Sequence, residues 1–252
     1  MDLGLKGKVA LVTGGGRDVG KAISLAMGAE GAKVAVNYNR SAKEAEAVVA
    51  EIEAAGGEAR AYQCDVTDYA SVKAMVASIV KDLGSIDVLV NNAGFVIPRL
   101  FTETTPDDWK RQVDIGLYGV IHCCHAVAPH MIEQKSGRIV NVTGDSARVG
   151  EKYLSVTAAS RGGVLSLTKS LARELGPSGI NVNCVAFGLV ETDHTDQAFL
   201  KKNYEKIVRQ YPLGRIGQAN DIAPMIAFLA SDSASWITGQ ILSINGGYAM
   251  VG

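Results

Sequence analysis

Short runs of valine, isoleucine and leucine alternate along the chain with longer segments whose apolar residues recur at helical spacing. Runs without a polar face are typical of strands buried on both sides of a parallel sheet. They predict seven strands, at Val9–Thr13, Lys33–Asn37, Ala59–Cys64, Val88–Asn91, Arg138–Thr143, Asn181–Ala186 and Gln240–Ile244. The periodic segments predict helices at Val19–Glu30, Ala42–Ala55, Tyr69–Leu83, Pro106–Glu133, Leu154–Leu175 and Asn220–Leu229.

The regular alternation of strand and helix predicts an α/β fold with right-handed crossovers. Glycines stand where several of these helices should end, which fits helix termination. No repeat, low-complexity tract or linker interrupts the pattern. We therefore expect residues 1–252 to form a single Rossmann-type doubly wound domain, with a seven-stranded parallel sheet flanked by helices.

Composition narrows the class of protein. A net charge of −1 gives no basic excess for nucleic acid or an anionic membrane. The N-terminus has no long apolar run, so we expect neither a signal peptide nor a spanning helix. The cysteines form no CxxC pair, and we expect a reduced, cytoplasmic protein. These cysteines are Cys64, Cys123, Cys124 and Cys184.

One short run looks like a metal cluster. It reads His122-Cys123-Cys124-His125 and falls inside a predicted helix. Consecutive side chains on a helix point in different directions, so these four cannot surround one tetrahedral ion. We predict no metal site.

A glycine-rich segment, TGGGRDVG at residues 13–20, follows the first predicted strand and opens the first helix. Glycines there permit a tight turn and let backbone N–H groups approach a pyrophosphate. A glycine cluster alone is weak evidence, but its place at the start of a βαβ series strengthens it. The segment therefore predicts a dinucleotide site.

Three segments together carry a family resemblance: TGGGRDVG, the run NNAG at residues 91–94, and NVNCVAFG at residues 181–188. The chain resembles the short-chain dehydrogenase/reductase family over nearly its whole length. The resemblance implies a nucleotide site that includes Gly14, Arg17, Asp18, Gly20, Asp65, Asn92, Gly94 and Thr192. Asp65 would contact adenine, the NNAG run would shape its pocket, and Thr192 would face the nicotinamide.

Asp18 departs from the family pattern, which has glycine there. Its carboxylate would repel phosphate in a poorly solvated site, at a cost that can reach several kcal/mol. Alternatively, Asp18 points to solvent or caps the helix by accepting its free N–H groups. The second strand ends without an acid, and Arg17 and Arg40 suit a 2′-phosphate, which slightly favours NADP.

The catalytic positions depart further. The family uses Asn, Ser, Tyr and Lys, and a nearby lysine lowers the tyrosine pKa from about 10. The matching positions here are Gly116, Gly144, Thr157 and Arg161. The two glycines offer no functional group, a threonine hydroxyl is a far weaker acid than a phenol, and arginine cannot give up a proton. We therefore predict that the family's catalytic residues are absent.

Two other readings stay open. Tyr153 lies one helical turn before Thr157, but the residue four positions later is Thr157 and not lysine. A buried carboxylate can be tuned toward neutral pH, so Asp145 with Arg161 is a candidate pair for a rebuilt site. Such a pair can also be purely structural.

From these losses we expect a catalytically degenerate member of the family. Its favoured role is the non-catalytic subunit of a heteromeric NAD(P)-dependent alcohol or β-hydroxyacyl-CoA dehydrogenase. It would hold no cofactor firmly, and NAD or NADP would sit in an active short-chain dehydrogenase paralogue of a hetero-tetramer. Two alternatives are an oxidoreductase with a rebuilt site at Asp145 and Arg161, and a nucleotide or ligand sensor.

Overall fold

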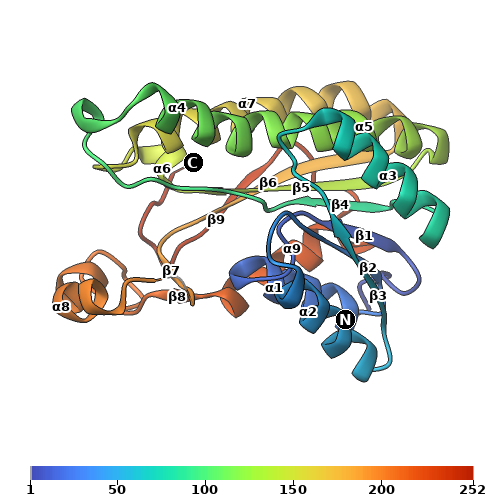
Figure 1. Cartoon of the computed structure of the whole chain (residues 1–252), viewed down its shortest axis with the longest axis horizontal. Coiled ribbons are helices and arrows are strands. Elements are labelled where there is room, and N and C mark those ends of the chain that lie inside the picture. Colours follow the sequence, from blue (N-terminus) through green and yellow to red (C-terminus); the bar gives the residue numbers. More distant parts are fainter. Residues whose placement is uncertain (1, 194, 252) are drawn as a thin grey trace.

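The computed structural model describes residues 2–193 and 195–251. Seven parallel strands form one sheet in the order β3-β2-β1-β4-β5-β6-β9, with helices on both faces (Figure 1). The strands are β1 (Val9–Val12), β2 (Lys33–Tyr38), β3 (Glu58–Gln63), β4 (Val88–Asn91), β5 (Gly137–Gly144), β6 (Ile180–Phe187) and β9 (Ile241–Ile244). The predicted fold class and sheet are confirmed.

Helices cover the sheet in two layers, as Figure 1 shows. One layer contains α1 (Asp18–Ala29), α2 (Ala42–Ala54) and α9 (Ala219–Leu229). The other contains α3 (Tyr69–Leu83), α4 (Pro106–Val113), α5 (Gly119–Gln134) and α7 (Ser155–Leu175). The central strands β1 and β4 are buried on both faces, so their side chains are apolar on both, which explains their unbroken apolar runs.

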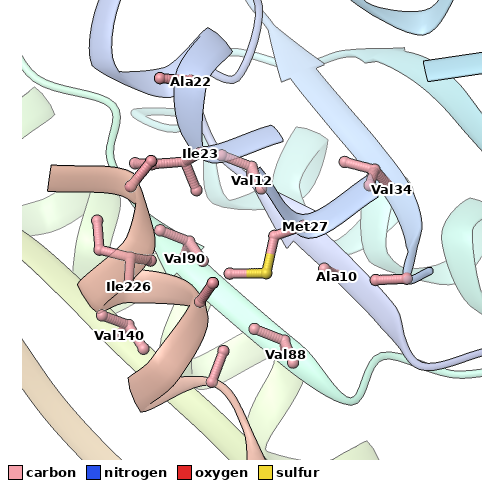
Figure 2. Close-up of a cluster of buried hydrophobic side chains, with 14 of the residues drawn as sticks. Ala10, Val12, Ala22, Ile23, Met27, Val34, Val88, Val90, Val140 and Ile226 are labelled. Atoms are coloured by element: carbon pink, nitrogen blue, oxygen red, sulfur yellow. The ribbon is translucent and has the colours of Figure 1, made fainter. Parts of the chain in front are cut away.

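Each layer has its own core. In Figure 2, Met27 of α1 lies among side chains of β1, β4 and α9, including Ala10, Val88 and Ile226. The second core joins α3, α5 and α7 to the opposite face, with Val127 of α5 fully buried. These two cores fix the carboxyl edge of the sheet, where ligands bind in this class of fold.

Several small elements escaped the sequence prediction. They are α6 (Ser146–Val149), α8 (Gln197–Val208) and a separate two-stranded sheet of β7 (Val190–Glu191) and β8 (Gly217–Gln218). Two-residue strands carry no periodic signal, so the pattern could not show them. Short 3₁₀ turns also occur at Phe101–Glu103, Gly176–Ser178 and Asp232–Ala234.

The long predicted helix is continuous but not uniform. Between α4 and α5 the backbone passes through a π-helical turn, Asp114–Tyr118. By length and composition alone, residues Pro106–Gln134 could cross a membrane. Core helices pass the same test, and α5 buries Val120, Cys123 and Val127 against the sheet. The helix is thus weak evidence for a membrane segment, and its π turn is the more informative feature, because such turns often mark functional sites.

Candidate active site

Hydrogen bonds hold the glycine-rich loop to the end of β4. The Asn92 side-chain amide donates to the carbonyls of Thr13 and Gly14, at 3.0 and 3.2 Å. The backbone N–H groups of Asn92 and Ala93 both donate to the Thr13 hydroxyl, each at 3.0 Å. Asn92 and Ala93 of the NNAG run thus hold the glycine-rich loop that follows β1 in place.

The glycines of this loop are required by the protein itself. A Cβ on Gly20 would lie 2.0 Å from the Gly14 carbonyl oxygen and 2.6 Å from the Asn92 amide. Gly14 has a φ of +60°, a conformation that side chains disfavour. Close packing against Asn92 therefore demands glycine at position 20 whether or not a pyrophosphate approaches.

Asp18 is the first residue of α1, and its φ of +51° lies in the left-handed region. The N-cap position belongs to Arg17, whose side chain makes no capping bond. The sequence analysis allowed Asp18 to be the N-cap of the helix. In the structure Arg17 holds the N-cap position, and Asp18 is the next residue. Its backbone conformation is one that glycine adopts without strain, which matches the family's preference at this position.

The loop after β3 is organised around Asp65, the residue that the family resemblance assigns to adenine. Its carboxylate accepts hydrogen bonds from the backbone N–H and hydroxyl of Thr67 at 2.9 and 2.8 Å, and from the Asn39 amide at 2.9 Å. Burial raises the pKa of Asp65, but the Thr67 and Asn39 bonds outweigh it and leave the pKa lowered. The loop after β2 places Arg40 at the surface, and Arg17 is exposed after β1.

These residues fit a phosphorylated dinucleotide. Arg17 and Arg40 are exposed near the N-terminus of α1, and helix N-termini attract anions. Asp18, partly exposed at the same terminus, opposes that attraction. At the nicotinamide end, Gly94 is exposed, and the Thr192 N–H donates to the Thr195 hydroxyl at 2.8 Å.

The positions that the sequence analysis matched to the family's catalytic residues lie against a buried polar cluster. Thr157 is 3% exposed, and its hydroxyl donates to the Gln112 side-chain carbonyl. The Ser160 hydroxyl donates to the Gln112 backbone carbonyl at 3.2 Å. A Cβ on Gly116 would lie 2.7 Å from the Ser160 hydroxyl. Thr157 is thus committed to a structural bond, and the space beside Gly116 is already occupied.

Arg161 reaches into the centre of the vacated site. A Cβ on Gly94 would lie 2.8 Å from one terminal nitrogen of Arg161, and a Cβ on Gly144 would lie 3.9 Å from the other. The guanidinium therefore extends from the cofactor side to the place of the family's serine. Burial lowers its pKa, which the nearby Cys184 partly offsets. Within the described residues, no hydrogen bond or ion pair reaches this guanidinium.

The proposed pairing of Asp145 with Arg161 is wrong. Asp145 is fully buried, and its two oxygens accept from the Ser243 hydroxyl at 2.8 Å and the Asn245 amide at 2.6 Å. Arg148 donates to the same Ser243 hydroxyl at 2.7 Å. Asp145 thus belongs to a network with β9 and α6, and the pairing failed because the sequence shows neither partner.

The His-Cys-Cys-His run disperses as helical geometry requires. His122 contacts the Val66 carbonyl at 2.9 Å, whereas His125 contacts the Tyr69 hydroxyl at 2.6 Å. The Cys124 thiol accepts from the Asn91 amide at 3.3 Å, and burial raises its pKa to about 12. No group of three potential metal ligands comes together within residues 2–193 and 195–251.

Three features are typical of nucleotide-dependent oxidoreductases of this fold. They are the Rossmann sheet, the glycine loop after β1, and the buried polar cluster in which Thr157 and Ser160 of α7 contact Gln112. A family model described as Enoyl-(Acyl carrier protein) reductase matches residues 15–249. The chain belongs to the short-chain dehydrogenase/reductase family, whose members use NAD(P)H.

Curated relatives are similar over nearly the full length. A 3-oxoacyl-[acyl-carrier-protein] reductase of Staphylococcus aureus is 45% identical over 243 residues, which cover 96% of this chain and 98% of the relative. The Synechocystis enzyme of the same name is 42% identical, with 98% of each chain covered.

Solved structures agree with the fold. A Sinorhizobium meliloti protein described as a short-chain alcohol dehydrogenase superposes with a TM-score of 0.93 at 32% identity, covering 98% of both chains. The structure of gox2181 gives 0.94 at 34% identity, covering 98% of this chain and 97% of that one.

These relatives contradict the predicted function. Chains 42–45% identical over nearly the whole length are named as reductases, which implies an active reductase and not a non-catalytic subunit. The joint loss at the catalytic positions also suggested a narrower likeness, to the inactive subunit of the 2-[hydroxy(phenyl)methyl]-succinyl-CoA dehydrogenase of anaerobic toluene breakdown. The comparisons support the family and give that likeness no support.

Proposed function

We propose that this chain is an NADPH-dependent reductase of 3-oxoacyl thioesters whose catalytic centre has been rebuilt around Arg161. The thioester class comes from the relatives, which are named for 3-oxoacyl substrates on a carrier protein. NADPH is favoured over NADH because β2 ends without an acid and Arg17 and Arg40 are exposed beside it. Bound at this edge, the reduced nicotinamide would supply a hydride.

The unpaired Arg161 guanidinium carries the proposal. A cation that is removed from water without an anionic partner lowers the free energy of unfolding. We therefore infer that the Arg161 guanidinium serves the function of the protein and not its stability. Negative charge develops on a carbonyl oxygen when its carbon accepts a hydride. Fixed N–H donors aimed at that oxygen stabilise the charge, and removal of one such donor typically costs about 100–1000-fold in rate.

The other three matched positions, Gly116, Gly144 and Thr157, are consistent with Arg161 as the group that binds the carbonyl oxygen. Thr157 is bonded to Gln112 and buried, so it would take no part in proton transfer. Gly116 and Gly144 leave the oxygen site to Arg161, whose nitrogen lies near the latter. Arginine keeps its charge at every working pH, so Arg161 would hold the oxygen without protonating it.

Cellular setting and assembly remain further proposals. The cytoplasm suits a chain whose four cysteines are free thiols in buried positions. The long helix of α4 and α5 exposes Trp109, Tyr118 and Ile132. Assembly with a related chain through this helix and α7 stays a prediction.

Steady-state kinetics test the proposed function. The purified chain should oxidise NADPH in the presence of a 3-oxoacyl thioester such as acetoacetyl-CoA. Arg161→Met should lower kcat at least about 100-fold, because the oxygen loses its donors. The same variant should change the unfolding temperature little, because the Arg161 side chain is partly exposed and no ion pair within the described residues is lost.

Arg173→Met is the matched control, because Arg173 is exposed on the same helix. It should leave kcat unchanged. Arg161→Lys should retain part of the activity, since it keeps a charge but loses the planar fork. A wild-type chain without turnover, or an Arg161→Met variant as active as the wild type, would overturn the proposal.

A further inference from the structure

A small cavity lies where the ends of β6 and β9 meet the separate sheet of β7 and β8. Its volume is about 160 Å³, and its wall is mostly apolar. The apolar side chains come from β7, α9, β9 and the turn before β8, and they include Val190, Ile222, Ile244, Tyr211 and Leu213. An apolar cavity of about 150 Å³ can hold one benzene-sized group. The cavity is therefore large enough for part of a small apolar ligand.

The amide of Asn245, which lines the cavity, is fully used inside the protein. Its nitrogen donates to the Asp145 carboxylate at 2.6 Å and to the Ala249 carbonyl at 2.8 Å. Its oxygen accepts from the Gly247 N–H at 3.0 Å. The bond to Asp145 also ties the cavity wall to the residue that directly follows Gly144.

The other polar side chains of the wall are paired in the same way. Arg215 donates to both oxygens of Asp221, at 2.6 and 2.7 Å. The Tyr211 hydroxyl accepts from the Leu189 N–H at 2.9 Å. A polar ligand group would give up its bonds to water and gain little in return, so the wall favours an apolar one.

The cavity adjoins the site assigned to Arg161. Gly188 lines the cavity and directly follows Phe187. A Cβ on Gly144 would lie 3.7 Å from the Phe187 carbonyl oxygen and 3.9 Å from an Arg161 nitrogen. The residue next to the cavity wall and the Arg161 guanidinium thus border the same position at the end of β5.

The wall has an open side and a closed side. Leu189 and Leu213 are exposed, whereas Val190 and Ile222 are buried. A flexible apolar chain can therefore enter beside the two leucines and end against the buried side chains.

We propose that this cavity binds the apolar end of the substrate's acyl chain, an inference that rests on the proposed function. In a 3-oxoacyl thioester, the ketone stands between the thioester and the rest of the chain. With the ketone oxygen at Arg161, the chain beyond the ketone continues past Gly188 into the cavity. The volume suits about five or six carbons, so the preferred substrates are medium-chain 3-oxoacyl thioesters.

The dependence of kcat/KM on chain length tests this inference. Each methylene that enters the cavity should raise kcat/KM about fourfold. We therefore expect 3-oxooctanoyl-CoA to exceed acetoacetyl-CoA at least about 10-fold, and 3-oxododecanoyl-CoA to gain nothing more. Equal kcat/KM for acetoacetyl-CoA and 3-oxooctanoyl-CoA would overturn the inference.

Two variants assign the chain-length preference to the cavity. Val190→Phe fills the closed side and should abolish the preference for 3-oxooctanoyl-CoA over acetoacetyl-CoA. Leu213→Trp narrows the open side from an exposed position and should lower the preference at least about threefold. Phe199→Trp is the matched control, because Phe199 is exposed on α8 outside the cavity, and it should leave the preference unchanged. If Val190→Phe does not fold, Leu213→Trp decides, and an unaltered preference in that variant contradicts the proposal.

Benzene provides a readout that does not depend on turnover. In buffer saturated with benzene, the unfolding temperature of the wild type should rise, because a ligand that binds only the folded state stabilises it. The rise should be absent or smaller in Val190→Phe and in Leu213→Trp, and equal to that of the wild type in Phe199→Trp. No rise in the wild type would mean that the cavity does not accept an apolar group, which overturns the inference.

Failure of this inference and failure of the proposed function give different results. An active wild type without a chain-length preference overturns the acyl-chain role alone. A wild type without turnover overturns the proposed function and the acyl-chain role with it, even where benzene binds.

Discussion

Two parts of the carboxyl edge of the sheet differ in their polar contacts. The cofactor edge comprises the ends of β1 to β4, and the substrate edge comprises the end of β5 and the helices beside it. After β1 and β4, Thr13 and Asn92 are joined by hydrogen bonds, and after β3, Asp65 accepts hydrogen bonds from Thr67 and Asn39. After β5, and along the helices beside it, lie the four positions that the sequence analysis matched to catalytic residues, and Gln112, Ser160 and Thr157 form a hydrogen-bonded cluster there. The bonds of the cofactor edge tie the glycine-rich loop to the end of β4, so they support the fold as well as the candidate site.

The largest effect should come from the cofactor edge. Asn92→Ala removes two hydrogen bonds and leaves the Thr13 and Gly14 carbonyls without that partner. We expect a loss of about 2–4 kcal/mol in the free energy of unfolding, measured by urea denaturation. Asn203→Ala is the control, since its exposed bond to the Phe199 carbonyl should contribute less than about 0.5 kcal/mol. If both variants lose the same free energy of unfolding, the Asn92 hydrogen bonds do not contribute specially to stability at the cofactor edge.

A matched pair tests how far the substrate edge has closed. Gly116→Asn places a Cβ 2.7 Å from the Ser160 hydroxyl, so we expect a loss of about 1–3 kcal/mol from overpacking. Gly144→Ser has nothing nearer than 3.5 Å and should change stability by less than about 0.5 kcal/mol. Thermal unfolding of both variants gives the comparison. If Gly116→Asn is harmless, the region has not repacked.

In the glycine-rich loop, Asp18 stands where the family pattern has glycine. Asp18→Gly should stabilise the chain by about 1 kcal/mol, because glycine adopts a φ of +51° without strain. It should also tighten NADPH binding, because a carboxylate leaves the helix N-terminus. Calorimetric titration measures the binding. Unchanged affinity would mean that the Asp18 carboxylate points away from the phosphates.

The smallest effect concerns acid stability. Arg215 donates to both oxygens of Asp221, at 2.6 and 2.7 Å, and lowers the Asp221 pKa to about 2. A folded pKa below the unfolded value of about 3.9 gives stability that is present above pH 4 and is lost as pH falls toward 2. The pair is partly exposed, so the contribution should be at most about 1 kcal/mol. Asp221→Asn should flatten that part of the stability profile.

The sequence predicted the sheet well because buried parallel strands leave unbroken apolar runs. Each predicted strand limit lies within one residue of the observed limit, as between Val9–Thr13 and Val9–Val12. The segment from β7 to β8 carried no comparable signal, because its strands have two residues each. His194 lies outside the described residues.

The candidate site was only partly predictable. Alignment with the family located Gly116, Gly144, Thr157 and Arg161, but it could not show that Arg161 lacks a partner.

Deuterium transfer tests the central claim, that the substrate edge is a rebuilt and working active site, most directly. The purified chain is mixed with a 3-oxoacyl thioester and NADPH carrying deuterium at both C4 positions, and the product is analysed by mass spectrometry. We predict one deuterium on the reduced carbon for the wild type, and about 100-fold less labelled product in the same time from Arg161→Met purified in the same way. A wild-type product without deuterium, or equal amounts of labelled product from both proteins, would contradict the account.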